Sequence, residues 1–144
     1  MNIPQRLWRF PTSDAREKLA ARFDFPNEPK MQDWQWEVAD HERIDEFLKA
    51  YKNGELSDDE RYILMETILE SFGGSGEIEP PSLRWQETLG LIENNIELHI
   101  YTVCYWACLD LEKEELDLAW ECAPQMRAML NRHRAHFDFP PYDV

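Results

Sequence analysis

The side chains best suited to metal binding or nucleophilic catalysis lie in one stretch of the sequence. Cys104 and Cys108 are four residues apart, and His99 precedes Cys104 by five residues, so a helix would place both thiols on one face. A tetrahedral zinc site would need a fourth ligand, which Cys122 or a C-terminal histidine could supply. No Cys-x-x-Cys pair is present, and no third group orients a cysteine–histidine pair for catalysis. We therefore expect small buried hydrophobic cysteines and neither metal nor cofactor.

Two further groups of titratable side chains lie on the C-terminal half of the chain. Glu93 and Glu97 are one helical turn apart, but bundles that bind paired metals repeat a Glu-x-x-His element. No glutamate precedes His99, His133 or His136 by three residues. The stretch "NRHRAHF" could bind phosphate or another acidic ligand, although cations in a last helical turn also complement the helix dipole. The chain also has no phosphate-binding loop and no nucleophile elbow, so the sequence favours a non-catalytic protein over an enzyme.

Aromatic residues mark the part of the sequence best suited to a small-molecule pocket. Amphipathic aromatic side chains with one or two polar neighbours are a typical pocket lining. Five tryptophans could contribute: Trp34, Trp36, Trp85, Trp106 and Trp120. The pocket is expected around Tyr105 and Trp106, and its candidate residues are Asn95, His99, Tyr105, Trp106 and Trp85. The same aromatic residues would also suit a packed core, and both interpretations stay open.

Apolar residues at steps of three and four predict helices over most of the chain. Ser57 and Glu60 have the spacing of a capping box, and Gly54 is placed for a left-handed helix end. The expected helices are 12–23, 41–54, 58–72, 82–111 and 124–137. Pro124 is expected in the first turn of the last helix.

Three segments between or within these helices are harder to assign. Residues 31–40 alternate Trp34, Trp36 and Val38 with polar residues, which indicates an extended segment or a short strand. Residues 96–106 would also suit a buried strand, although the helical period runs into them without a breaker, and the likeliest break is Asn94-Asn95. Residues 110–123 are an acidic connection with room for one helical turn, and 73–82 form a Gly- and Pro-containing loop.

The elements together predict an all-α protein: one domain, 1–144, built as a bundle of about five helices with extended, proline-containing arms at both ends. In this scheme residues 1–40 pack as a helix and arm on a bundle of residues 41–137, and 138–144 form a tail. The word Phe-Asp-Phe-Pro occurs in both arms, at residues 23–26 and 137–140. Proline disfavours helix at the residue before it, so both copies of this motif are expected to end a helix. Their phenylalanines are expected to pack each arm against the bundle.

The charge of the chain is −14 and is unevenly distributed. Residues 1–30 carry +2, residues 31–121 carry −17, and residues 122–144 carry +1. An acidic body repels nucleic acid, whose affinity for proteins comes largely from lysine and arginine, and attracts basic proteins. No apolar run is long enough for a membrane span, the first residues do not resemble a signal peptide, and the odd number of cysteines suits reduced thiols. We expect a cytoplasmic protein that binds neither nucleic acid nor membrane.

In its small size, acidity, helical pattern and tryptophan content the chain resembles the immunity and antitoxin-like proteins of bacteria. The resemblance implies a bacterial, non-catalytic regulatory protein that engages a basic protein partner. The alternative is a small-molecule-binding protein or enzyme with an aromatic pocket near His99, Tyr105 and Trp106, and a third interpretation is a DNA-mimicking inhibitor. A homodimer is a further possibility, because Tyr62, Met65, Met126 and Met129 could form either a dimer seam or the core.

Overall fold

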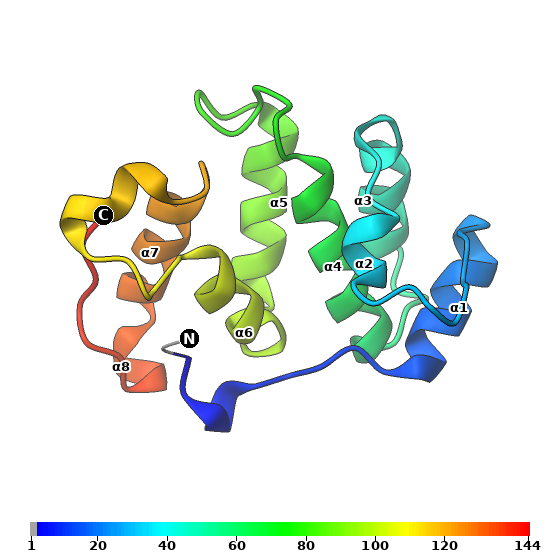
Figure 1. Cartoon of the computed structure of the whole chain (residues 1–144), viewed down its shortest axis with the longest axis horizontal. Helices are drawn as coiled ribbons and strands as arrows, with labels where there is room; N and C mark the ends of the chain where they lie inside the picture. Colours follow the sequence, from blue (N-terminus) through cyan, green and yellow to red (C-terminus); the bar gives the residue numbers. More distant parts are fainter. Residues whose placement is uncertain (1–2) are drawn as a thin grey trace. The chain divides into compact units, whose positions relative to one another are not determined.

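The computed structural model of the protein describes residues 3–144, which form helices joined by turns and loops without any β-strand among them (Figure 1). The all-α prediction is confirmed. The described chain divides into two compact units, one of residues 10–88 and one of residues 3–9 together with 89–144. The chain passes from the first unit to the second within helix α5, between Thr88 and Leu89. The single-domain assignment stays a prediction, and each unit is described on its own below.

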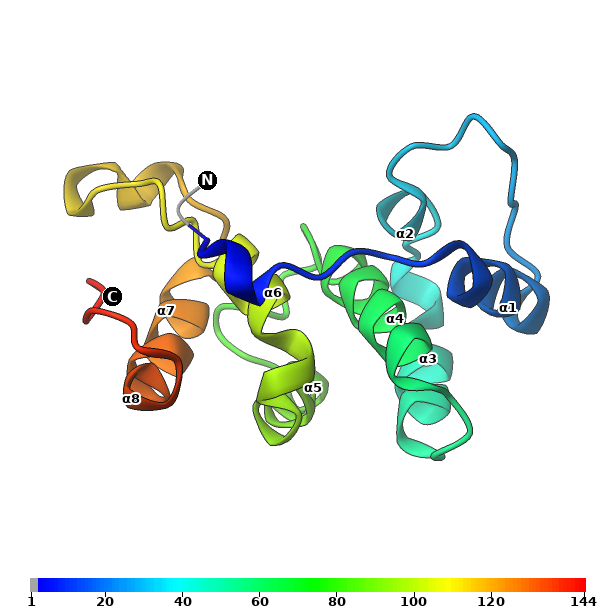
Figure 2. The same ribbon diagram turned by 90° about the horizontal axis from the view of Figure 1, so that it is seen from below.

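The unit of residues 10–88 is organised around one long buried helix, α4. Its helical elements are α1 (Ser13–Phe23), α2 (Trp34–Glu37), the 3-10 helix η2 (His41–Arg43), α3 (Ile44–Lys52), α4 (Asp58–Ser71) and the first half of α5 (Leu83–Asn94). Helix α4 packs against α1, α2 and α3, and it lies alongside α3 in both views (Figure 1; Figure 2). The predicted capping box of Ser57 and Glu60 starts it. Every side chain from Tyr62 to Leu69 is buried, so α4 forms the core of this unit.

The segment predicted as extended, residues 31–40, contains instead the one-turn helix α2, and the prediction is wrong there. Trp34 and Val38 are buried while Trp36 is only partly so, and burial at positions four apart is the helical spacing. The indole Nε1 of Trp34 donates to the carbonyl oxygen of Pro26 at 2.6 Å, which satisfies its polar group in the core. Apolar residues at alternate positions over five residues are compatible with a strand and also with a single helical turn. The packing of this segment against α4 favours the helix.

The unit of residues 3–9 and 89–144 is built on α6. Its elements are the 3-10 helix η1 (Gln5–Leu7), the second half of α5, α6 (Ile96–Trp106), the 3-10 helix η3 (Lys113–Leu118), α7 (Ala123–Arg132) and α8 (Arg134–Phe137). Helix α6 packs against α7. Residues 96–106 form helix α6 and not the alternative buried strand. The helical turn expected within residues 110–123 is present as η3.

Over residues 3–144 there are more helices than the predicted five, because α2 and three short 3-10 helices are added and two predicted helices are interrupted. The expected helix over 82–111 breaks at Asn95 (φ −125°, ψ 41°), whose side-chain amide donates to the carbonyl oxygen of Leu91 at 3.0 Å. This hydrogen bond replaces one that a continuous helix would make. The expected last helix also breaks, at His133 (φ −112°, ψ 12°), which separates α7 from α8.

The two Phe-Asp-Phe-Pro words form the same helix stop, one in each unit, as predicted. In both copies the aspartate has a left-handed backbone, with φ of 55° at Asp24 and 59° at Asp138. The N–H of the following phenylalanine then donates to the carbonyl oxygen five residues earlier, at 2.9 Å from both Phe25 and Phe139. This is the bond of a Schellman-type helix end.

An arginine from a distant segment completes each stop. The carbonyl oxygen of Phe23 accepts from Arg43 at 2.8 Å, and that of Phe137 accepts from Arg6 at 2.6 Å. Both carbonyls lie at a helix C-terminus, where a cation is favoured by the helix dipole. The rings of Phe23 and Phe137 are buried. The shared word therefore encodes a local structure that is used twice.

We expect the left-handed aspartates to tolerate glycine and to resist β-branched residues. Asp24→Gly and Asp138→Gly should each raise the free energy of unfolding by about 0.5 kcal/mol, because glycine adopts φ > 0 without steric cost, offset in part by its unfolded-state entropy. Asp24→Val and Asp138→Val should lower it by about 1–2 kcal/mol. Urea unfolding followed by circular dichroism measures all four. Equal stability of the glycine and valine variants would contradict the left-handed assignment.

None of the helices between residues 3 and 144 combines the length and the apolar character needed to cross a bilayer.

Candidate functional site

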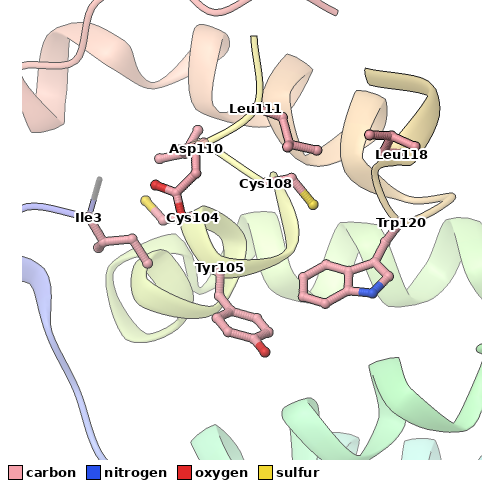
Figure 3. Close-up of a pocket in the computed structure, with 9 residues that line it drawn as sticks. Ile3, Cys104, Tyr105, Cys108, Asp110, Leu111, Leu118 and Trp120 are labelled. Atoms are coloured by element: carbon pink, nitrogen blue, oxygen red, sulfur yellow. The ribbon is translucent and has the colours of Figure 1, made fainter. Parts of the chain in front are cut away.

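An apolar pocket of about 320 Å³ lies in the unit of residues 3–9 and 89–144. It is formed by the end of α6, the turn that follows it and the segment that leads into α7. Its lining residues are Ile3, Cys104, Tyr105, Cys108, Leu109, Asp110, Leu111, Leu118 and Trp120. Figure 3 shows Cys104, Tyr105 and Cys108 projecting from the end of α6 and its turn, while Leu118 and Trp120 come from the segment that leads into α7, with the ring of Trp120 beside that of Tyr105. Leu118 is 74% exposed and Trp120 43% exposed, so the pocket opens to solvent on that side.

The turn that carries Cys108 is held by a buried arginine from α7. Arg127 is 3% exposed, and its guanidinium donates to three carbonyl oxygens of the turn, those of Ala107 at 2.7 Å, Cys108 at 2.5 Å and Leu111 at 3.0 Å. A fourth bond reaches the carbonyl oxygen of Asp143 at 3.2 Å. The carbonyl groups at the end of a helix have no partner within it. Arg127 therefore closes the end of α6 and fixes one wall of the pocket.

Cys108 has a left-handed backbone (φ 54°) in this turn. A residue other than glycine pays for that conformation unless its surroundings hold it. The two hydrogen bonds of Arg127 that flank it, to Ala107 and Cys108, supply that restraint. The strained turn places the partly exposed thiol of Cys108 in the pocket wall.

Three aromatic rings pack together beside the pocket. The centroid of Trp120 lies 5.1 Å from that of Tyr105 and 4.6 Å from that of Trp106. Tyr105 and Trp120 line the pocket, whereas Trp106 is 7% exposed and lies behind them. Offset and edge contacts of this kind stabilise aromatic clusters. The rings therefore give the pocket a rigid aromatic side.

The structure brings only part of the predicted candidate set to this pocket. Tyr105 lines it and Trp106 packs on its lining, as expected, but His99 is fully buried and does not belong to the lining. Asn95 forms the break between α5 and α6. Trp85 is fully buried in the other unit, with its ring 4.9 Å from that of Phe72. Cys108, Leu111 and Leu118 were not predicted to line a pocket. The two large apolar residues Leu118 and Trp120 within an acidic stretch could have indicated a binding surface there.

The thiols near the pocket have the properties of core residues. Burial raises the pKa of Cys104 to about 12, and the positive charge of Arg6 offsets little of this. Burial is also the main cause that raises the pKa of Cys122 to about 12. A thiol must lose its proton to act as a nucleophile or metal ligand, and these two remain protonated near neutral pH. Over residues 3–144, no group of three or more histidine, cysteine or acidic side chains is arranged to hold a metal ion.

The basic stretch of α7 and α8 is bound to the two glutamates that precede it in sequence. Arg132 donates to both carboxylate oxygens of Glu93 at 2.9 Å, and His133 lies 2.7 Å from the same carboxylate. The hydrogen bond from Arg132, and secondarily that from His133, lower the pKa of Glu93. His136 lies 2.7 Å from Glu97. The stretch considered for an acidic ligand is therefore occupied by the chain's own carboxylates.

The loop between α4 and α5 is anchored by a second carboxylate cluster, in the unit of residues 10–88. Arg84 donates to both oxygens of Glu77 at 2.7 Å, and His41 lies 2.6 Å from one of them. The hydrogen bond from Arg84 is the main cause that lowers the pKa of Glu77 to about 2, with His41 and Ser82 contributing. A carboxylate this acidic stays charged at neutral pH. It ties down the loop and is poorly suited to act as a general base.

An acidic segment runs along the open side of the pocket. Residues 110–121 contain six acidic side chains and one lysine, and all six acidic residues are exposed. The segment includes η3, which starts with a reciprocal capping box between Glu112 and Glu115. Leu111, Leu118 and Trp120 from the same segment line the pocket. Apolar lining and negative charge are therefore interleaved along one short stretch of chain.

No protein-family model matches this chain, and neither the curated proteins nor the solved structures contain a significant match to it.

Proposed function

We propose that this protein is a non-catalytic binding protein that engages a basic protein partner through the acidic segment 110–121. The observation that carries the proposal is an open pocket with a rigid aromatic side, bordered by six exposed acidic side chains within twelve residues. Clustered charge of one sign steers an oppositely charged partner and speeds its association. Exposed aromatic residues beside such charge are the usual anchors of protein interfaces.

The chemistry near the pocket supports binding rather than catalysis. Among the described lining residues, Asp110 is the only one with an acidic or basic side chain, and Cys104 remains a protonated thiol. General acid–base catalysis needs positioned groups that exchange protons near the working pH. Binding needs only complementary shape and charge, which the rings of Tyr105 and Trp120 and the acidic segment offer.

A small-molecule ligand is the second candidate, favoured by the size of the pocket. Its volume of about 320 Å³ lies at the lower end of the range, about 300–1,000 Å³, that is typical of ligand pockets. A small apolar ligand would not need the acidic segment. The two candidates therefore differ in how strongly binding depends on the charges of residues 110–121.

We expect selection from a display library of random twelve-residue peptides to enrich peptides of net positive charge. Their affinity for the protein should fall at least tenfold between low and high salt, because exposed charges are screened. The double reversal Glu114→Lys/Asp117→Lys should lower affinity at least tenfold at low salt, measured by isothermal titration calorimetry.

The matched control is Glu17→Lys/Glu28→Lys, which makes the same change in net charge at exposed residues of the unit 10–88. It should lower affinity by no more than about twofold. Selected peptides without a charge preference would contradict the proposal. An equal loss of peptide affinity in both double variants would also contradict it, because binding would then depend on the net charge of the whole protein and not on the acidic segment.

A further inference from the structure

We propose that the pocket beside the acidic segment receives one bulky apolar side chain, such as leucine, methionine or phenylalanine, from an amphipathic basic partner. This inference rests on the proposed function and specifies how the partner is recognised. A purely electrostatic partner would leave the pocket unused. The arrangement of the lining residues indicates instead that charge brings the partner in and that an apolar anchor holds it.

The lining favours an apolar occupant over a charged one. Four aliphatic residues, two cysteines and two aromatic residues surround a single carboxylate, that of Asp110. A guanidinium or ammonium group buried there would leave most of its N–H groups without acceptors, which is costly. A hydrocarbon or aromatic side chain leaves no polar group unsatisfied. Charged residues of the partner are better placed outside, over the acidic side chains of residues 112–121.

The exposure of the pocket rim indicates that an occupant would cover apolar surface. Leu118 and Trp120 are 74% and 43% exposed, and each stands among acidic side chains on the same segment. One large side chain that enters the pocket of about 320 Å³ would cover this apolar rim. Trp120, the aromatic residue at the rim, is of a residue type enriched among interface hot spots.

The walls of the pocket are preformed rather than loose. Arg127 holds the turn of Cys108 with three hydrogen bonds, and Trp120 packs on Tyr105 and Trp106 at the other side. A preorganised site loses less conformational entropy when it binds. This rigidity is why one anchoring side chain should have a measurable effect on affinity.

The experiment uses one basic peptide from the display selection in two versions of identical charge, with its bulky apolar residue kept or replaced by alanine. We expect the alanine version to bind the full chain about 30-fold more weakly by calorimetry. Trp120→Ala should weaken binding of the parent peptide by a similar factor, and Leu118→Ala by about fivefold. The matched control Leu83→Ala removes a leucine of comparable exposure, 85% exposed and outside the pocket lining, and should leave affinity unchanged.

A thiol footprint provides the second readout. Cys108 lines the pocket and is partly exposed, whereas Cys104 and Cys122 are buried. Alkylation of Cys108 by N-ethylmaleimide, followed by peptide mass spectrometry, should slow at least tenfold when the parent peptide is saturating, but not with the alanine version at equal occupancy. Salt-dependent binding of both versions with equal affinity, or unprotected Cys108, would overturn the anchor while leaving the proposed function standing. Absence of any charge preference in the selection would overturn both.

Discussion

Replacement of Arg127 by alanine is expected to lower the free energy of unfolding of the unit that contains it by about 4 kcal/mol. The guanidinium is 3% exposed and donates to four backbone carbonyl oxygens. Hydrogen bonds from a charged group are each worth about 1.5–3 kcal/mol, and removing the donor leaves buried carbonyl groups unsatisfied. The left-handed turn at Cys108 also loses the restraint that holds it.

Urea unfolding monitored by tryptophan fluorescence and by circular dichroism measures this loss. Arg127→Lys should recover less than half of the stability, because an ammonium cannot reach carbonyl oxygens on both sides of the turn as a planar guanidinium does. Arg134→Ala removes an exposed arginine from the neighbouring helix α8 and should change stability by no more than about 0.5 kcal/mol. Equal effects at Arg127 and Arg134 would show that the carbonyl bonds contribute little.

The parts of the fold that could be predicted are those whose cause is local. Ser57 and Glu60 satisfy each other's backbone groups within four residues, so the start of α4 can be read directly from their spacing. Gly54 has φ 81°, as expected of a glycine at a helix end. The two Phe-Asp-Phe-Pro words specify the same stop for the same reason, because proline and the hydrogen bonds of the turn lie within one short segment.

The errors arise where two local signals compete and distant packing decides. Trp34, Trp36 and Val38 fit a strand and a single helical turn equally well, and contact with α4 selects the helix. The sequence marks Asn94-Asn95 as the likeliest place for a break in a long helical pattern. The break itself depends on the hydrogen bond from the Asn95 side chain to the carbonyl oxygen of Leu91, which the sequence pattern does not show. Both outcomes depend on energies of about 1 kcal/mol, which sequence periodicity does not resolve.

The candidate site was predictable in region but not in composition. The aromatic residues Tyr105, Trp106 and Trp120 can be recognised in the sequence as pocket candidates, and their rings pack together beside the pocket. His99 carries the same kind of signal, yet its position on α6 faces the core and it is fully buried. Arg127 has no local feature that separates it from Arg132 or Arg134. Its role in closing the end of α6 depends on a tertiary contact with the turn after α6, which lies about twenty residues earlier in the sequence.

The stability of the unit 10–88 is expected to fall as the pH rises through the range from about 4.5 to 7, because of Glu66. This side chain is 4% exposed in the middle of α4. Burial raises its pKa from 4.5 to about 7, and hydrogen bonds with Tyr62 and Gln35 oppose the rise only in part. The folded state therefore holds a proton that the unfolded state releases near pH 4.5. The contribution of Glu66 to stability is fully present below that pH and falls by about 3 kcal/mol by pH 8, at about 1.4 kcal/mol per pKa unit.

Glu66→Gln tests this directly, because an amide resembles the protonated carboxyl group and does not titrate. The variant should match the wild type within about 1 kcal/mol at pH 5 and be more stable by about 2–3 kcal/mol at pH 8, measured by urea unfolding at both pH values. Glu70→Gln removes the same charge from an exposed position on the same helix and isolates the effect of burial. It should show no comparable gain between the two pH values. A constant difference between wild type and Glu66→Gln across this range would mean that Glu66 is already charged in the folded core, and that water or a rearranged Gln35 solvates it there.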